Sequence, residues 1–292
     1  DPSASNYDET ANIDDGNCSF LYYSLNFNGE NDYVHIPHEF FGGGMTSEFT
    51  VELWVKSQDA NQTELNGLWY KGANWQDICL RTHNGNLSWF YALPNTYYGT
   101  SSGEQLSYDS WDHVAMVMDG TELKMFRNGR LVATGTGSGS ISWEIDDIIE
   151  VDNNFLGRIF EEWEWQYFNG KISQFKVSSN ARYSDNFFPD FPLTADESTE
   201  ALYSFSNASD NQLTDVSGNN YHATIYGADW STDVPCESSL GDLNGDGGYN
   251  VLDVVTLVNC VLSGNCDVLE NGCAGDMNSD GGYNVLDVVT LV

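Results

Sequence analysis

The sequence has few basic residues, and their distribution excludes several classes of function. Its 292 residues contain only ten Lys and Arg against 44 Asp and Glu, which gives a formal net charge of −34. All ten lie between Lys56 and Arg182, so both ends of the chain are acidic and lack counter-ions. Nucleic-acid binding needs clustered Lys and Arg, and an anionic membrane surface would repel such a chain. Acidic ends either repel themselves into extension or bind cations, and we favour cations.

The sequence also lacks long apolar runs and closely spaced cysteine pairs. No apolar stretch approaches the ~18 residues needed to cross a bilayer, so we predict no membrane span. Because the chain begins with Asp1, we expect a signal peptide to have been removed or to lie outside this segment. The absence of Cys-x-x-Cys argues against a zinc ribbon or a thioredoxin-type centre. We expect most cysteines to form disulfides outside the cell: Cys18, Cys79, Cys236, Cys260, Cys266 and Cys273.

Helical periodicity is absent before the tail. Residues 20–232 instead contain short segments broken by Gly and Asn, and segments 49–55 and 111–118 alternate with a period of two, as half-buried strands do. Asn84-Gly85 and Asn128-Gly129 lie between apolar runs, and a type I′ hairpin turn needs residues that accept positive φ. With no helix between the strands, the pattern predicts an antiparallel β-sandwich.

Six segments of this region are similar to one known family, in that family's usual order. The first is Tyr23-Ser-Leu-Asn-Phe-Asn-Gly-Glu-Asn-Asp-Tyr-Val, and the others are 49–55, 111–115, 126–132, 168–177 and 215–230. Together they resemble the LamG-like (concanavalin A-like) jelly-roll family, which implies a mainly β, jelly-roll sandwich over residues 20–232. Residues 1–19 resemble a short cysteine module of exported bacterial proteins. We expect residues 233–240 to form a linker to the tail.

The tail, residues 241–292, repeats itself with a period of 34. Residues 241–258 match residues 275–292 except at Leu243/Met277 and Gly245/Ser279. In each copy, oxygen-bearing side chains fill positions 1, 3, 5, 9 and 12 of a loop, and a glycine fills position 6, where the chain must turn sharply. This spacing is typical of an EF-hand calcium loop, with Asp at position 12 and a backbone carbonyl at position 7. The predicted Ca²⁺ ligands are Asp242, Asn244, Asp246, Gly248, Asn250 and Asp253, and Asp276, Asn278, Asp280, Gly282, Asn284 and Asp287.

An apolar stripe follows each loop, as in a helix that leaves it. The pair resembles a type I dockerin, a calcium-binding module of two loop–helix units that docks onto a cohesin. This chain has Val251-Leu252 and Val285-Leu286 where dockerins commonly carry small hydroxyl residues for recognition. Such pairs are costly to leave in water, so we expect them to be buried against the other unit or against a partner. The candidate partners are a cohesin-like protein and copies of the chain itself.

The sandwich region carries aromatic side chains beside carboxylates and amides, a combination that holds sugar rings. The same alternation is also found on the core face of a strand, and the sequence leaves both interpretations open. The candidates are Trp69, Tyr70, Trp75, Trp89, Tyr91, Trp163 and Trp165. Asp32 and Asp215 lie in segments where related jelly rolls hold a structural calcium ion, which the resemblance implies here as well.

One acidic segment bears on catalysis. Glu144-Ile-Asp-Asp-Ile-Ile-Glu150 resembles the carboxylate strand of glycoside hydrolases that share this fold. On a regular strand its two glutamates would lie about 20 Å apart, too far to act on one glycosidic bond. We therefore predict no catalytic residues, and a secreted, calcium-binding bacterial protein for adhesion to, or recognition of, an extracellular glycan or protein. The alternatives are a subunit of an extracellular fibre or surface layer, because both ends look like interrupted modules, and a glycoside hydrolase.

Overall fold

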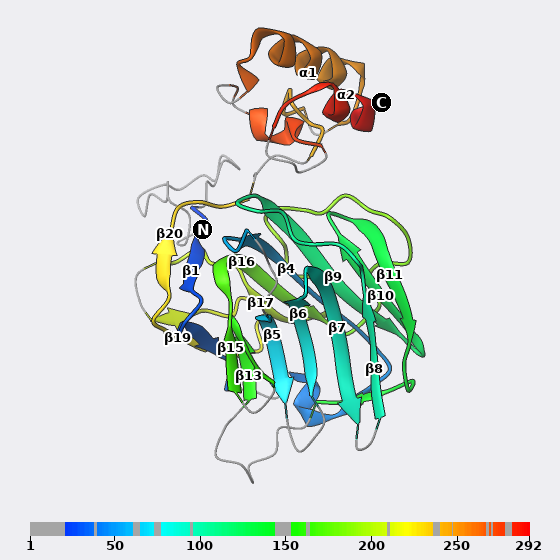
Figure 1. The fold of residues 1–292 in the computed structure, drawn as a ribbon, viewed down its shortest axis with the longest axis vertical. Helices are drawn as coiled ribbons and strands as arrows, with labels where there is room; N and C mark the ends of the chain where they lie inside the picture. Colours follow the sequence, from blue (N-terminus) through cyan, green and yellow to red (C-terminus); the bar gives the residue numbers. More distant parts are fainter. Residues whose placement is uncertain are drawn as a thin grey trace, which may run out of the picture.

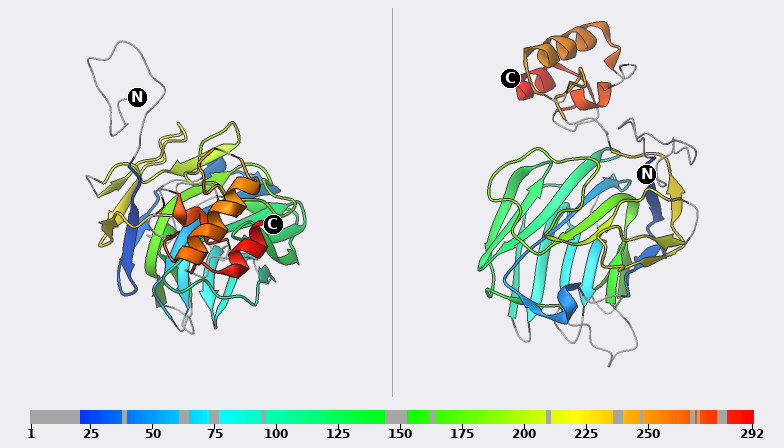
Figure 2. Two further views of the ribbon diagram at one scale, coloured as in Figure 1. Left: turned by 90° about the horizontal axis from the view of Figure 1, so that it is seen from above. Right: turned by 180° about the vertical axis from the view of Figure 1, so that it is seen from behind.

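The protein consists of a β-sandwich and a small helical domain at one end of it (Figures 1 and 2). The computed structural model describes residues 21–37, 40–60, 65–72, 77–93, 96–143, 153–161, 164–208, 211–235, 240–246, 248–266, 269, 271–277 and 282–292. Within these ranges, no helix is long and apolar enough to cross a membrane.

Two large antiparallel sheets form the sandwich. The first sheet has the order β11 (Arg130–Thr136), β10 (Glu122–Arg127), β9 (Trp111–Asp119), β4 (Glu48–Ser57), β16 (Asn169–Ser178), β1 (Ser24–Asn28) and β20 (Asp229–Ser231), with β17 (Thr199–Tyr203) beside β16. The second sheet has the order β18 (Gln212–Leu213), β19 (Ala223–Tyr226), β2 (Tyr33–His35), β13 (Asn153–Leu156), β5 (Asn66–Gly72), β6 (Ile78–His83), β7 (Asn86–Leu93) and β8 (Thr96–Ser101). Smaller elements are η1 (Phe40–Gly43) and the strand pairs β3 (Met45–Thr46) with β12 (Ile141–Ser142) and β14 (Arg158–Glu161) with β15 (Glu164–Tyr167). The predicted mainly β sandwich is confirmed.

Both predicted hairpin turns are confirmed. Asn84 and Gly85 have φ of 50° and 74° and join β6 to β7, whereas Asn128 and Gly129 have φ of 49° and 70° and join β10 to β11. A Cβ on Gly129 would also lie 1.7 Å from the carbonyl oxygen of Phe187, so this turn needs glycine for space as well as for conformation.

The core lies between the two sheets. Along β4, Phe49, Val51, Leu53 and Val55 all point into it and are wholly buried, as the period-two alternation predicts. Large aromatic rings fill much of the space: Trp69, Trp89, Trp143, Tyr91, Tyr203, Phe27, Phe40 and Phe168 are all at most 1% exposed. Burial on this scale stabilises the sandwich by the hydrophobic effect.

The tail forms α1 (Val251–Ser263), η3 (Gly272–Gly275) and α2 (Val285–Leu291). A disulfide between Cys260 and Cys266 closes the C-terminal end of α1, in agreement with the expectation that most cysteines are oxidised. Cys273 is also disulfide-bonded, whereas Cys79 is a free, buried thiol in the sandwich. The tail contacts the sandwich where the ring of Tyr249 stacks on that of Phe188, with 5.3 Å between centroids.

Candidate functional site

The first loop of the tail brings three carboxylates together. Ligand atoms of Asp242, Asp246 and Asp253 all lie within 4.8 Å of one another. They form the single group of three or more His, Cys, Asp or Glu residues that could hold a metal ion in the described part of the chain. Three predicted ligands that are up to eleven positions apart in the sequence therefore converge on one point.

Backbone amides explain why the loop curls around that point. The amide of Asp246 donates to Oδ1 of Asp242 at 3.1 Å and to Oδ1 of Asn244 at 2.9 Å, and the amide of Gly248 donates to Oδ1 of Asp246 at 2.9 Å. Such Asx-type bonds replace secondary-structure bonds in a tight turn. Gly245 adopts a φ of +71°, where a side chain would be strained.

Asn250 and Asp253 fix the end of the loop to the start of α1. They form a capping box, in which Oδ1 of Asn250 accepts from the amide of Leu252 and Oδ2 of Asp253 accepts from the amide of Asn250. Oδ1 of Asp253 accepts from the amide of Asn244 across the loop. The carboxyl of Asp253 is wholly buried, so the loop and the helix are built around this one side chain.

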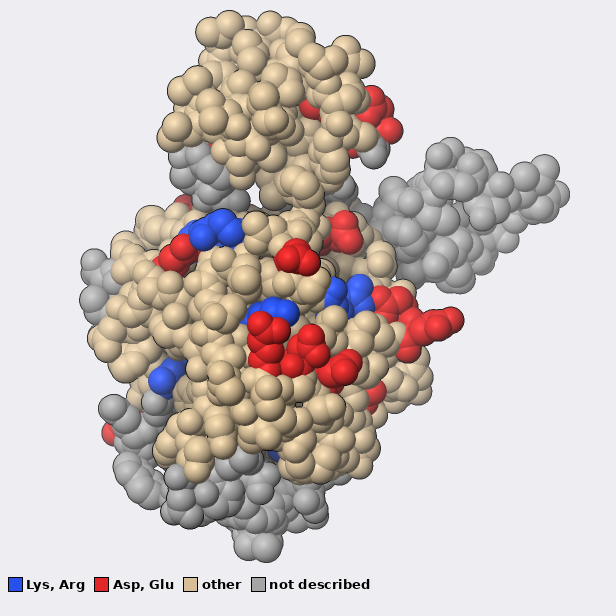
Figure 3. All heavy atoms as spheres, turned by 90° about the vertical axis from the view of Figure 1, so that its right-hand side faces the viewer, with Lys and Arg blue, Asp and Glu red and all other residues tan. Residues whose placement is uncertain are grey.

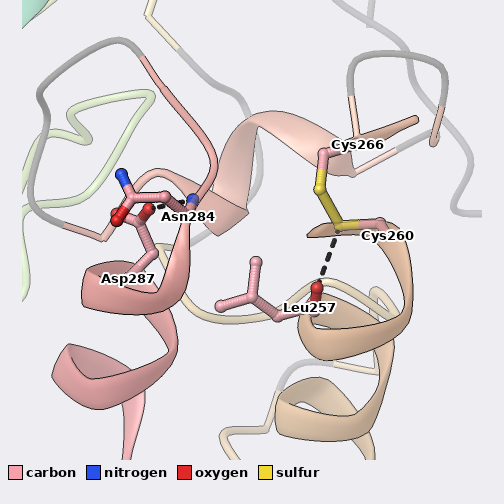
Figure 4. Close-up of a disulfide and its surroundings, with 5 residues drawn as sticks. All are labelled: Leu257, Cys260, Cys266, Asn284 and Asp287. Carbon is pink, nitrogen blue, oxygen red and sulfur yellow. Dashed lines mark hydrogen bonds between the residues drawn. A yellow bond between two sulfur atoms is a disulfide. The ribbon is translucent and has the colours of Figure 1, made fainter. Parts of the chain in front are cut away.

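The end of the second loop repeats the capping geometry of the first. Asn284 caps α2 with φ of −150° and ψ of −174°, against −149° and −179° for Asn250. Its amide donates to Oδ2 of Asp287 at 2.8 Å, and Asp287 is wholly buried like Asp253 (Figure 4). Of the other predicted ligands in this loop, Asp276 and Gly282 are described, whereas Asn278 and Asp280 lie outside the described residues. The sequence repeat is thus also a structural repeat at the two helix starts.

The donor set suits Ca²⁺. Its ligands are hard oxygens from carboxylates, amides and the Gly248 carbonyl, in a flexible ring. The tail contains no Lys or Arg that could neutralise the clustered Asp242, Asp246 and Asp253. A divalent cation would relieve their mutual repulsion, and Asp242, Asn244, Asp246, Asn250 and Asp253 are the side chains that would hold it.

The apolar pairs beside the loops are exposed, and the expected burial against the other unit is wrong. Val251 and Leu252 are 70% and 58% exposed, and Val285 and Leu286 are 65% and 58% exposed. The first turn of each helix points away from the small tail core, whose buried members are Leu243, Leu257, Cys260, Cys266 and Ala274. Partner burial thus stays the prediction for these pairs.

Two residues of the apolar stripes extend this surface, although the sequence did not assign them to it. Val255 and Val289 are at least half exposed, and each lies four positions after the first residue of its pair. The i, i+4 spacing on a helix was a usable signal, because it places both side chains on one face. Figure 3 shows a face of the tail that is nearly free of charged side chains, with Asp and Glu gathered at one edge. We call residues 251, 252, 255, 285, 286 and 289 the apolar helix face.

Most aromatic candidates in the sandwich do not form a sugar-binding surface. Trp69, Trp89 and Tyr91 belong to the core between the sheets, and Tyr70 is buried on the other side of the second sheet. Their rings pack against neighbouring strands and leave no face for a ligand, so this prediction is wrong for all four. Trp165 is half-buried, with the Arg158 guanidinium 4.0 Å from its ring centroid. Trp75 and Trp163 lie outside the described residues.

The predicted calcium sites at Asp215 and Asp32 both stay predictions. Each carboxylate oxygen of Asp215 already accepts two hydrogen bonds, from Leu202 and Ser217 amides at Oδ1 and from Tyr221 and Ser217 at Oδ2. Asp215 therefore closes a turn. Asp32 accepts from the Asn28 amide at 2.9 Å. Burial, with a smaller effect of neighbouring carboxylates, raises its pKa.

The segment of the proposed carboxylate strand, Glu144 to Glu150, lies outside the described residues. The expected wide separation of Glu144 and Glu150 therefore stays a prediction from the sequence.

Comparison with known proteins places both parts of the chain. Residues 28–186 match the concanavalin A-like lectin/glucanases superfamily, and this stretch is more than half of the chain. The chain belongs to this superfamily. Strands β17 to β20 extend the concanavalin A-like sandwich beyond the matched stretch, to Ser231. Residues 240–292 match the type I dockerin domain, so the chain also carries a dockerin. No curated protein matches the sequence.

Several solved structures are similar to part of this chain. A crystal structure from Bacteroides ovatus, whose suggested role is carbohydrate binding, is 20% identical with a TM-score of 0.55; the match covers 74% of this chain and 61% of that one. A Ruminococcus gnavus sialidase module, CBM40, bound to α2,3-sialyllactose is 19% identical with a TM-score of 0.44 over 55% of this chain and 93% of that one. A pentraxin from Limulus polyphemus is 15% identical with a TM-score of 0.41 over 56% and 78%. At 20% identity, the Bacteroides ovatus structure bears on the fold alone.

Proposed function

We propose that this chain is a non-catalytic, glycan-binding protein that its calcium-bound dockerin attaches to a cohesin-type receptor. The concanavalin A-like sandwich would hold the glycan, and the dockerin would place it in a larger extracellular assembly of a bacterium. The two family matches support a recognition module joined to a docking module.

The observation that carries the docking half is the apolar helix face. Two copies of one surface, each built from a Val-Leu pair and a Val one turn later, stay exposed in a domain whose described residues include five buried apolar side chains. Water contact with such a surface costs roughly 25 cal/mol per Å², which a partner would recover. The cohesin surface that receives it should therefore be apolar where hydroxyl-rich dockerins meet polar groups.

Calcium would control this docking. Asp253 and Asp287 are wholly buried in the loops, and the first turn of each helix begins two residues before them. The direction in which Val251 and Val285 point thus depends on the carboxylates that hold the ion. Loss of the ion would leave repelling carboxylates at the base of both helices and would disperse the apolar helix face.

The test uses an array of purified type I cohesin domains as bait for the whole chain. We expect capture in Ca²⁺ and none in a chelator. Serine at Val251, Leu252, Val285 and Leu286 together should abolish capture while calorimetry still shows calcium binding. Because the two surfaces are alike, changing one pair alone should leave capture by the other.

Val216→Ser, at an exposed valine of the sandwich, is the matched control and should not change capture. Undiminished capture by the fourfold serine variant would refute the docking surface. Loss of calcium binding in that variant would instead mean that these side chains stabilise the loops themselves.

A further inference from the structure

The dockerin contacts the end of the sandwich through a calcium loop. Figures 1 and 2 show α1 on the side of the dockerin that faces away from the sandwich. The contact is made by Tyr249, whose ring stacks on that of Phe188 with 5.3 Å between centroids and 25° between planes. Counted from Asp242 as position 1, Tyr249 occupies position 8 of the first loop. The ring that touches the sandwich thus belongs to the loop that would hold the ion.

The sandwich fixes the backbone on both sides of Phe188. The amide of Phe187 donates to the carbonyl of Gly129 at 2.9 Å, and the carbonyl of Asp190 accepts from Nε1 of Trp54 at 3.1 Å. The side chain of Phe188 is 60% exposed, so it projects from a segment that is held at both ends. The sandwich therefore presents this aromatic ring to the dockerin in a fixed place.

Tyr249 lies close to the ligands of its own loop. Its backbone is between positions 7 and 9, which are both ligand positions of the predicted site. Its ring lies beside Gly241, the residue before Asp242, because a Cβ on Gly241 would be 3.1 Å from Cδ1 of Tyr249. Gly241 also has a φ of +93°, which favours glycine at this place. The direction of the Tyr249 ring therefore depends on the shape of the first loop.

The second loop places the matching residue at the same boundary. Tyr283 is the counterpart of Tyr249, 34 positions later in the repeat. Tyr283 and Asp276, the predicted first ligand of this loop, line a cavity of about 180 Å³. Three aromatic side chains of the sandwich line the same cavity: Trp54, Trp111 and Phe191. Both calcium loops thus contribute their position-8 tyrosine to the boundary with the sandwich.

The stack of Tyr249 on Phe188 should differ between the two states of the loop. While the carboxylates of Asp242, Asp246 and Asp253 are unbalanced, they repel one another, and the loop does not hold Tyr249 in one direction. When the ligands at positions 7 and 9 are engaged, the backbone on both sides of Tyr249 is fixed. A contact that is more favourable in one of two states shifts the equilibrium toward that state.

We propose that the Tyr249–Phe188 contact couples calcium binding in the first loop to attachment of the dockerin to the end of the sandwich. By linkage, the sandwich raises the calcium affinity of this loop by the same factor by which the ion strengthens the contact. This rests on the calcium-bound dockerin of the proposed function and gives its ion a second role. The bound ion would fix the direction of the sandwich, and of a glycan held on it, relative to the cohesin.

The test is a calorimetric titration of the whole chain with Ca²⁺. Phe188→Ala is the main variant, because it changes no atom of the dockerin. We expect one calcium site to bind about threefold to tenfold more weakly in this variant, as the loss of one aromatic pair implies. Phe188→Tyr, which keeps the ring, should restore the affinity. Tyr97→Ala removes a 77% exposed ring on β8 and is the matched control, with both sites unchanged.

A double-mutant cycle shows whether the two rings act through one contact. Tyr249→Ala combined with Phe188→Ala should bind Ca²⁺ no more weakly than Tyr249→Ala alone. Nuclear magnetic relaxation gives a second measurement, because two attached domains tumble together. In saturating Ca²⁺ the amides of both domains should share one rotational correlation time in the wild type, and the dockerin should tumble faster in Phe188→Ala.

The outcomes separate this coupling from the proposed function. Unchanged calcium affinity in Phe188→Ala, or independent tumbling of the two domains in the wild type, would overturn the coupling. Capture by a cohesin in excess Ca²⁺ would then still support the proposed function. No calcium binding by the wild type would remove the calcium-bound dockerin itself. Unchanged unfolding of the sandwich of Phe188→Ala in urea would confirm that the variant is folded.

Discussion

The sandwich and the dockerin are stabilised in different ways. The sandwich encloses one continuous core with three wholly buried tryptophans, Trp69, Trp89 and Trp143. Among the described residues of the dockerin, the core has five buried members, two of which form the Cys260–Cys266 disulfide. A core that small supplies little hydrophobic stabilisation, and domains of this size usually need metals or disulfides. We therefore expect the sandwich to fold by burial of apolar side chains and the dockerin to fold by binding metal ions.

The distribution of charge follows the same division. On the face seen in Figure 3, the Lys and Arg of the sandwich lie beside Asp and Glu. The sandwich contains ion pairs such as Arg127 with Asp112 and Arg182 with Asp196. The dockerin has no Lys or Arg at all, so its buried Asp253 and Asp287 have no cationic side chain nearby in sequence. Cations from solution are left to balance them.

Calcium removal should have the largest effect, and should affect only the dockerin. We expect a chelator to abolish the helical circular-dichroism signal of α1 and α2, because carboxylates such as Asp242 and Asp246 would then repel one another. Asp242→Ala combined with Asp276→Ala should weaken calcium binding at least about a hundredfold in calorimetry. A helical signal that persists in the chelator would contradict the view that the dockerin needs bound Ca²⁺ to fold.

The sandwich supplies its own reporter for this experiment. Burial raises the pKa of the Cys79 thiol to about 12, and the side chain is 1% exposed, so it should not react with a thiol reagent near neutral pH. Cys79 should stay protected in chelator and react once denaturant opens the sandwich. Reaction of Cys79 in chelator alone would show that the two domains unfold together.

Trp89→Ala should destabilise the sandwich and leave the dockerin unchanged. The ring is wholly buried, and its Nε1 donates to the Lys124 carbonyl at 3.1 Å. Its removal leaves a cavity and an unpaired carbonyl, so we expect a loss of about 3–5 kcal/mol in the free energy of unfolding of the sandwich, measured in urea. Calcium binding by the dockerin should be unchanged; weaker binding would mean that the dockerin depends on the sandwich for its fold.

The sequence predicted features that are encoded locally. A type I′ turn needs only two adjacent residues with positive φ, so Asn84-Gly85 and Asn128-Gly129 identified both hairpins. The order of ligands in a calcium loop is likewise local, and Asp242, Asp246 and Asp253 do converge.

Structural features that depend on residues far apart in the sequence could not be predicted from it. Whether Tyr70 faces solvent depends on the β14–β15 hairpin, which lies about ninety residues further along the chain and packs over β5. Asp215 accepts hydrogen bonds from the amides of Leu202 and Tyr221, and the segment around Asp215 alone does not show these contacts. The contact between Tyr249 and Phe188 joins the two domains, and no single segment contains both residues.

The disulfide should contribute a smaller share of dockerin stability than calcium. Cys260 and Cys266 are six residues apart and close a short loop, which restricts the unfolded chain little. Serine at both positions should lower the free energy of unfolding of the calcium-bound dockerin by about 2 kcal/mol, measured by thermal unfolding in excess Ca²⁺. Capture by a cohesin should persist in the variant. Complete loss of helix in excess Ca²⁺ would mean that the disulfide contributes more to dockerin stability than the ion does.

The smallest expected effect is at Asp233, where the chain leaves the sandwich toward the dockerin. Burial opposes ionisation of this carboxylate, but hydrogen bonds from Lys171, Trp111 and Lys56 outweigh it and lower its pKa. A lowered folded-state pKa gives stability that is present above the unfolded-state value, 3.8, and is lost as pH falls through the folded value. Asp233→Asn should therefore cost about 0.5 kcal/mol at neutral pH, since the ion pairs are partly exposed.

The measurement is the unfolding of the sandwich between neutral pH and the acid side of that pKa, with Tyr108→Ala as a surface control. The difference between wild type and Asp233→Asn should shrink as pH falls below about 4, because both then carry a neutral group at this position. If the difference in the free energy of unfolding were the same at every pH, Asp233 would stabilise the end of the sandwich through hydrogen bonds that do not depend on its charge. Acid would then not weaken the segment that leads from the sandwich to the dockerin.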